Sequence, residues 1–171
     1  MLTALIDYES GNLHSALKAF EKISSENSLG SVTITNDPEI ISDPDRLVLP
    51  GDGAFPACKA ALEKSEVFEA LKHAVLAKRR PFLGICVGMQ LMAKKGFEFE
   101  PTNGLNWING QVERIQLDDP SLKIPHMGWN EIAIDYDHAI LKDIKNGDHF
   151  YFVHSYPVSY THLRAHETEA D

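Results

Sequence analysis

The first half of the chain repeats one pattern: a short apolar run, a glycine or proline turn, and a segment whose apolar residues have helical spacing. Apolar runs predict buried strands at residues 2–6, 32–35, 46–49 and 81–86. Leu13, Leu17 and Phe20 lie on one face of a helix that starts near Asn12, and residues 67–78 have a similar stripe. Strands that alternate with helices predict an α/β fold with a parallel sheet covered on both faces. Ligands bind such sheets at the carboxyl ends of the strands.

After Gly104 the pattern changes to short β-like pieces separated by turns. They lie at residues 111–117, 131–134 and 150–153. No stretch has the composition of a linker, so we expect an antiparallel extension of the same domain, which would span residues 1–157.

Composition narrows the classes of function. A chain of 171 residues with 43% hydrophobic and 24% charged residues is typical of one folded globular domain. The net charge is −9, and the longest basic run is residues 78–80, so neither nucleic acid nor a membrane surface is an expected partner. No apolar run approaches the roughly 18 residues of a membrane span. The two cysteines lack zinc-like spacing, so we expect a cytoplasmic protein without a metal.

The segment Gly84-Ile85-Cys86-Val87-Gly88 has the form of a nucleophile elbow with cysteine as the nucleophile. Glycines on both sides allow a sharp turn from strand to helix, which lifts the cysteine side chain above the sheet. A helix N-terminus beneath the sulfur favours the thiolate, the reactive form. The alternative is a buried core cysteine, a common state for this residue. Cys58 lacks flanking glycines, and we expect it to be structural.

A second turn, at residues 50–55, follows another predicted strand. Its two glycines, Gly51 and Gly53, allow a backbone N–H to point into the crevice. Together with the amide of Val87, the amide of Gly53 would form a two-donor oxyanion hole. Taken alone, the segment is an ordinary turn.

Five segments together resemble the glutaminase subunit of imidazole glycerol phosphate synthase, a class I glutamine amidotransferase. The elbow at 84–90 and the turn at 50–55 are shared by all class I amidotransferases. Two further segments point to this subunit: Asp7-Tyr8 with Gly11-Asn12-Leu13, and Pro125-His126-Met127-Gly128-Trp129-Asn130. The fifth segment of the resemblance is His154-Ser155-Tyr156. The resemblance covers residues 1–157. It implies a flavodoxin-like fold and an enzyme that takes ammonia from glutamine without a cofactor.

The resemblance also assigns roles to individual residues. Cys86 would attack the glutamine carboxamide and form a γ-glutamyl thioester, and the amides of Gly53 and Val87 would stabilise the oxyanion. The residues expected to bind the substrate are Gln90, Glu98, Ser155 and Tyr156.

The resemblance implies a heterodimer with a (βα)8-barrel cyclase. Ammonia would pass to this subunit, which makes imidazole glycerol phosphate and an aminoimidazole carboxamide ribotide in histidine biosynthesis. The residues expected to face it are Asn12, Pro125, His126, Met127, Gly128, Trp129 and Asn130. His126 has no second metal ligand two to four residues away, which disfavours a metal site.

Two positions depart from the family pattern. Asp52 stands between the glycines of the turn where an apolar residue is expected, and a carboxylate there would oppose a nearby oxyanion. Asn106 stands where a glycine is usual.

The C-terminal part of the sequence departs most from the family pattern. The family completes its catalytic triad with a His-x-Glu pair, and no histidine of this sequence is followed two positions later by Glu. His166 precedes Glu167 directly, and His154 has no carboxylate near it in sequence. Residues 158–171 resemble one translated frame of a sequencing adapter. We expect them to be an artefact fused to a truncated gene and detached from the core, and we expect weak or no turnover.

Two other functions remain open from the residues. One is another elbow-cysteine hydrolase, similar to DJ-1 or to a peptidase, which Gln90 and residues 125–130 disfavour. The other is a non-catalytic subunit that binds the cyclase without turning over glutamine.

Overall fold

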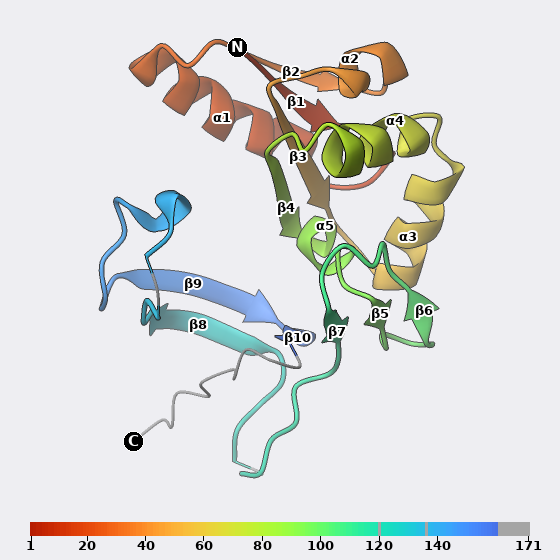
Figure 1. The fold of residues 1–171 in the computed structure, drawn as a ribbon. Coiled ribbons are helices and arrows are strands. Elements are labelled where there is room, and N and C mark those ends of the chain that lie inside the picture. The colour runs from red at the N-terminus through yellow and green to blue at the C-terminus, as the bar shows by residue number, and fades with distance from the viewer. Residues whose placement is uncertain (120, 136, 161–171) are drawn as a thin grey trace. The chain divides into compact units, whose positions relative to one another are not determined.

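The structure, a computed structural model, describes residues 1–119, 121–135 and 137–160, and the chain divides into two compact units. Of the described residues, 1–113 and 158–160 belong to the first unit, and those between Arg114 and Pro157 belong to the second. Figure 1 shows the path of the chain through both.

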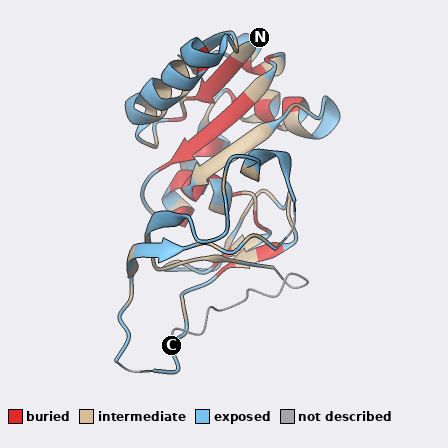
Figure 2. Ribbon diagram, turned by 90° about the vertical axis from the view of Figure 1, so that its left-hand side faces the viewer, coloured by how far each residue is buried: buried red, intermediate tan, exposed pale blue. Residues whose placement is uncertain are grey.

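A four-stranded parallel sheet forms the core of the first unit. Its strands are β1 (Leu2–Ile6), β2 (Ser31–Thr35), β3 (Arg46–Gly51) and β4 (Phe82–Cys86), in the order β2-β1-β3-β4. The two central strands are the most deeply buried, as their near-continuous apolar sequences require (Figure 2). This sheet confirms the expected α/β class and places the ends of β3 and β4 side by side.

Helices cover the parallel sheet. They are α1 (Leu13–Asn27), α2 (Pro38–Ser42), α3 (Phe55–Lys64), α4 (Phe68–Lys72), a π-helix (His73–Ala77) and α5 (Val87–Gln90). Figure 1 shows α1 on one side of the sheet, and α3 and α4 on the other. The Asn12 side chain caps α1 by accepting from the amide of Ser15 at 3.2 Å, as its position predicts.

A small mixed sheet completes the first unit. It contains β5 (Lys95–Gly96), β6 (Thr102–Asn103), β7 (Gly110–Val112) and β10 (Val158–Tyr160), in the order β10-β7-β5-β6. The strand expected at residues 111–117 is shorter, and it pairs parallel with β5, so this part of the extension is not purely antiparallel.

The strand β10 corrects one expectation about the C-terminal segment. We expected no strand after residue 157, but Val158 pairs antiparallel with Val112, which is fully buried. The error came from judging the segment by its composition, whereas three residues are enough to extend an existing edge. Residues 161–171 lie outside the described residues, and the foreign origin of the segment remains a prediction that resequencing of the locus would check.

The second unit contains an antiparallel hairpin of β8 (His126–Glu131) and β9 (His149–His154), and a 3-10 turn (Ala139–Leu141). The strand expected at 131–134 is wrong in position, because β8 ends where that range begins. The strand is formed by residues 126–131, which include the segment that we expected to face the partner. Its alternation places His126, Gly128 and Asn130 on one face.

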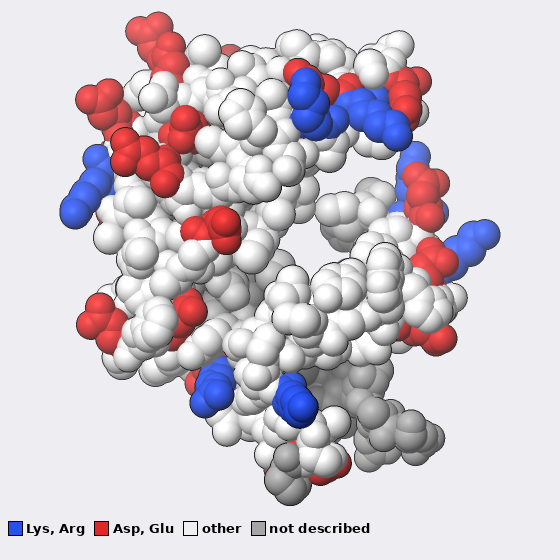
Figure 3. All heavy atoms as spheres, turned by 180° about the vertical axis from the view of Figure 1, so that it is seen from behind, with Lys and Arg blue, Asp and Glu red and all other residues white. Residues whose placement is uncertain are grey.

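Lysine and arginine side chains are scattered among acidic ones on the face shown in Figure 3. No continuous basic patch forms on this face.

Candidate active site

Cys86 occupies the turn between β4 and α5. It is exposed, and its φ of 54° and ψ of −121° place it in a region that L-residues rarely adopt. Such strain is typical of a nucleophile elbow, where the neighbouring packing holds the backbone in place. The structure therefore shows the predicted turn with an accessible thiol at its apex.

The two glycines of the elbow are required by close backbone contacts. A Cβ on Gly88 would lie 1.8 Å from the carbonyl oxygen of Leu49, and one on Gly84 would lie 2.5 Å from the Cα of Met89. Neither contact leaves room for a methyl group. The short helix α5 is thus seated directly on β3 and β4.

The turn that follows β3 meets the elbow. Gly51 and Cys86 are register partners at the ends of β3 and β4. A Cβ on Gly51 would lie 2.5 Å from the amide nitrogen of Gly88 and 3.0 Å from the Cβ of Val87. The structure therefore brings together the two segments that the sequence singled out.

Gly53 lies just beyond this contact, with a φ of +110° that favours glycine. The neighbouring Asp52 has an exposed side chain, but its backbone is tied down. Ser10 Oγ donates to the Asp52 carbonyl oxygen at 3.0 Å, and Cys58 Sγ donates to the same oxygen at 3.3 Å. Sequence reasoning missed this contact, because the three residues come from separate segments of the chain.

Tyr8 lies beneath the same turn. Its side chain is buried, and its hydroxyl oxygen would lie 2.9 Å from a Cβ on Gly51. Burial raises the pKa of the phenol, so the group stays neutral. Within the described part of the chain the hydroxyl has no hydrogen-bond partner of good geometry, although it lies beside Ser10 and Cys58.

Two of the residues expected to bind the substrate lie in the first unit. Gln90 ends α5, one turn beyond the elbow. Glu98 accepts a hydrogen bond from the amide of Phe55 at 2.8 Å, at the first turn of α3. Its carboxylate therefore holds the helix that follows Gly53, and its expected contact with the glutamine amino group remains a prediction.

The remaining expected residues lie in the second unit. Asn130 Nδ2 lies 2.8 Å from His126 Nε2, and the rings of His126 and Phe152 stack with centroids 5.2 Å apart. Partial burial and the nearby His126 lower the pKa of His154. The carbonyl oxygen of Ser155 accepts from the amide of Ile115 at 2.9 Å, so that oxygen is already engaged.

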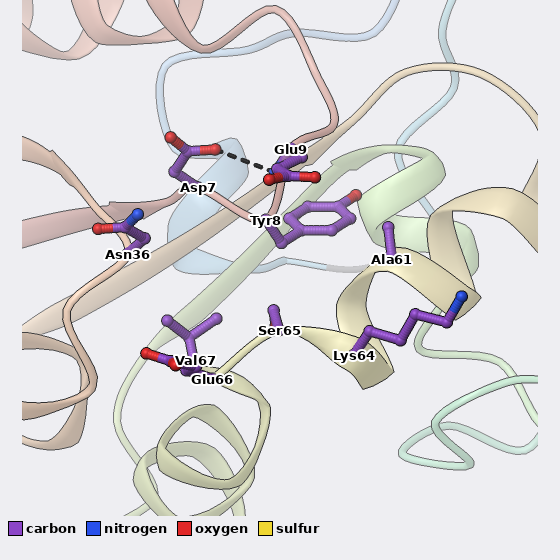
Figure 4. Close-up of a pocket in the computed structure, with 9 residues that line it drawn as sticks. All are labelled: Asp7, Tyr8, Glu9, Asn36, Ala61, Lys64, Ser65, Glu66 and Val67. Atoms are coloured by element: carbon purple, nitrogen blue, oxygen red, sulfur yellow. Dashed lines mark hydrogen bonds between the residues drawn. The ribbon is translucent and has the colours of Figure 1, made fainter.

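A hollow of about 330 Å³ lies at the carboxyl ends of β1 and β2 (Figure 4). Its lining residues are Asp7, Tyr8, Glu9, Asn36, Ala61, Lys64, Ser65, Glu66 and Val67. The lining does not include Cys86, and Tyr8 stands between the hollow and Gly51. The elbow cysteine Cys86 thus lies outside this hollow.

Two kinds of feature are absent from the described residues. These residues include no group of three or more His, Cys, Asp or Glu side chains able to hold a metal ion. They also include no helix long and apolar enough to cross a membrane.

Comparison with known proteins gives consistent matches. A family model described as "Glutamine amidotransferase class-I" matches residues 4–169. The imidazole glycerol phosphate synthase subunit HisH of Cereibacter sphaeroides is 52% identical over 172 residues, covering 100% of this chain and 81% of the relative. The subunit of the same name from Ruegeria pomeroyi is 57% identical over 157 residues, covering 91% and 74%. That of Caulobacter vibrioides is 46% identical, covering 98% and 79%.

Proposed function

We propose a mechanism for this chain on the premise that it belongs to the class I glutamine amidotransferases, within the family of HisH subunits of imidazole glycerol phosphate synthase. Its function is that of the glutaminase subunit in histidine biosynthesis, in which glutamine is hydrolysed to glutamate and ammonia. The observation that carries the mechanism is the strained, exposed Cys86 seated against the turn at Gly51.

The mechanism gives a role to each of the expected catalytic and substrate-binding residues. The sulfur of Cys86 attacks the carboxamide carbon of glutamine, and the carbonyl oxygen gains the negative charge. The amides of Gly53 and Val87 donate to that oxygen. Collapse of the adduct breaks the carbon–nitrogen bond, and the proton that the thiol loses passes to the leaving nitrogen, so that ammonia is released. The thioester that remains is hydrolysed by water to glutamate and the free thiol. Gln90 and Glu98 bind the substrate, and Ser155 and Tyr156 contact its carboxylate through their backbone.

The thiol assignment gives a direct prediction. A chloromethyl ketone analogue of glutamine is expected to alkylate Cys86 at least roughly ten times faster than Cys58, because the second thiol is only 3% exposed. Peptide mass mapping of the labelled chain measures both rates.

Two controls sharpen this experiment. Cys86→Ala should remove the fast labelling, and excess glutamine should slow it in the parent chain. Faster labelling of Cys58 would show that the elbow does not carry the nucleophile.

We also propose that the hairpin of β8 and β9 docks onto the cyclase subunit, a (βα)8 barrel, in a cytoplasmic heterodimer that also involves Asn12. The support is an apolar face of the second unit. Met127 and Trp129 are 59% and 68% exposed, and Tyr151 and Val153 opposite them are 54% and 60% exposed. Exposed aromatic and methionine side chains on one face are typical of a protein interface.

Trp129→Ala is expected to weaken binding to the cyclase subunit by about 2 kcal/mol, or roughly 30-fold in Kd, since tryptophan is a frequent hot-spot residue. Titration calorimetry measures the change. Leu76→Ala, at a residue 54% exposed in the first unit, serves as the control. Equal affinities for the two variants would place the interface elsewhere.

The absence of a His-x-Glu pair keeps the non-catalytic function as a second candidate. Binding to the cyclase without glutamate release would favour it. Release of ammonia from glutamine would exclude both this candidate and an elbow-cysteine hydrolase of another kind.

A further inference from the structure

We infer that the start of α3 and a strained turn at Phe99 preassemble the site for the amino group of the substrate, because together they hold the carboxylate of Glu98 in one place. The inference rests on the proposed function, in which Glu98 binds glutamine. It goes beyond that function by naming the positioning residues behind Glu98, which are Phe55, Gly96 and Phe99.

The helix α3 lacks a capping side chain of its own. Ala54 at its N-cap position makes no side-chain hydrogen bond, and Pro56 in its first turn has no N–H group. The amide of Phe55 donates instead to Oε2 of Glu98 at 2.8 Å, although the two residues are 43 positions apart in sequence. A bond from an amide to a carboxylate is charge-assisted, and the helix dipole favours a carboxylate at this end of α3.

Phe55 also contacts the strand that precedes Glu98. A Cβ on Gly96, in β5, would lie 2.6 Å from Cδ1 and 2.8 Å from Cγ of the Phe55 ring. The ring is fully buried, so it has no open space into which it could turn to make room. Phe55 therefore restrains Glu98 in two ways, through its amide and through the packing of its ring on the strand two residues earlier.

The backbone that follows Glu98 is held by a tight turn. The amide of Glu100 donates to the carbonyl oxygen of Glu98 at 2.7 Å, and the residue between them, Phe99, has a φ of 61°. This is a γ-turn with positive φ, which is rare and strained for a bulky residue. The side chain of Phe99 is 87% exposed, so burial of the ring does not offset the strain. Strain of this kind clusters at ligand sites, where it pre-organises the groups that bind.

The bond to α3 uses one oxygen of the carboxylate. With Oε2 on the amide of Phe55, the second oxygen, Oε1, takes the ammonium group of glutamine. A carboxylate that is already oriented loses little side-chain freedom when the substrate binds, so more of the interaction appears as affinity. The contacts around Glu98 therefore set the affinity for a substrate that carries an amino group.

A matched pair of variants at an exposed position tests the turn. Glu100→Pro removes the amide that closes the turn at Phe99, whereas Glu100→Ala keeps it, and both remove the same carboxylate. Gly96→Ala is an independent break, because its methyl would displace β5 from the Phe55 ring. The pair at Glu100 lies in an exposed loop, so it decides the matter even if Gly96→Ala does not fold. Glu98→Gln keeps an oxygen that accepts from Phe55 but removes the charge.

Hydrogen exchange of the Phe55 amide reports whether Glu98 is held, and it needs no turnover. The first amides of a helix have no partner within the helix, so the protection of this one depends on Glu98. In 15N-labelled chains we expect exchange roughly ten-fold faster in Glu100→Pro and Gly96→Ala than in the parent, and a much smaller change in Glu100→Ala and Glu98→Gln. Parent-like exchange in both Glu100→Pro and Gly96→Ala overturns the inference.

Two chloromethyl ketones connect the held carboxylate to the substrate. One carries the α-amino group of glutamine and the other lacks it, and the concentration dependence of Cys86 labelling gives the inhibition constant KI of each. In Glu100→Pro and Gly96→Ala we expect KI to rise roughly ten-fold for the amino ketone and less than about two-fold for the other. Equal changes for the two ketones, or no change for the amino ketone, overturn the inference, because a merely structural loss affects both reagents.

Glu98→Gln separates this inference from the proposed function. It should raise KI for the amino ketone roughly ten-fold, since a neutral amide does not replace the charge. An unchanged KI in Glu98→Gln, or no labelling of Cys86 in the parent chain, would contradict the proposed function and the inference with it. A rise in Glu98→Gln without one in Glu100→Pro or Gly96→Ala would overturn the inference alone and leave the proposed function intact.

Discussion

Mixed with a cyclase subunit and that subunit's ligand, the 171-residue chain is expected to release glutamate about 10²–10⁴-fold more slowly than a HisH relative that contains the His-x-Glu pair. Cys86 and both expected oxyanion amides are present, but none of the eight histidines is followed two positions later by Glu. Without a positioned base and its orienting carboxylate, the reaction loses the contribution of general acid–base catalysis. A coupled assay of glutamate release measures the difference.

The control for this prediction is His154→Ala. The pKa of His154 is lowered by partial burial and by His126, so its ring stays neutral to a lower pH than usual and retains a free lone pair. It is therefore the first histidine to test as a substitute base. Turnover equal to that of the relative, lost in His154→Ala, would contradict the expected deficit.

Secondary structure and the elbow were predicted most accurately where the local sequence pattern agrees with the tertiary contacts. Each strand of the parallel sheet was expected within one or two residues, because a strand buried on both faces is a continuous apolar run. The elbow was predicted for a similar reason. The residues around Cys86 that allow the turn, Gly84 and Gly88, are also its sequence neighbours.

Short and exposed strands were harder to predict. The segment from His126 to Glu131 has no continuous apolar run and includes a glycine, so its strand was missed in favour of residues 131–134. The strand β10 depends on pairing with Val112 rather than on its own composition. Both strands are determined by a partner distant in sequence.

The structure shows how two positions that depart from the family pattern are accommodated. Asn106 stands where glycine is usual and has a φ of 57°, a left-handed conformation that asparagine tolerates better than most residues. Asp52 keeps its side chain exposed while its backbone is bound by Ser10 and Cys58. Sequence alone does not reveal such a contact, because neither residue stands in a pattern that points to the turn.

Gly88→Ala is expected to lower the free energy of unfolding by about 3 kcal/mol, which corresponds to a fall of roughly 6–12 °C in Tm for a chain of this size. The added methyl would lie 1.8 Å from the carbonyl oxygen and 2.8 Å from the carbonyl carbon of Leu49. These are backbone atoms of Leu49, which is fully buried in the central strand β3, so relief requires a backbone shift rather than a side-chain rotation. Thermal unfolding followed by circular dichroism measures the change.

Met89→Ala is the matched control for this variant, because Met89 is the next residue of α5 and its side chain is 43% exposed. It should lower the free energy of unfolding by less than about 1 kcal/mol. Equal losses in the two variants would mean that α5 is not seated on β3 as closely as the structure shows. Because Val87 directly precedes Gly88, a backbone shift at Gly88 is expected to displace the amide of Val87. Labelling of Cys86 by the glutamine-analogue ketone should therefore slow in Gly88→Ala at temperatures where the variant is still folded. A normal rate there would separate the packing of the elbow from its chemistry.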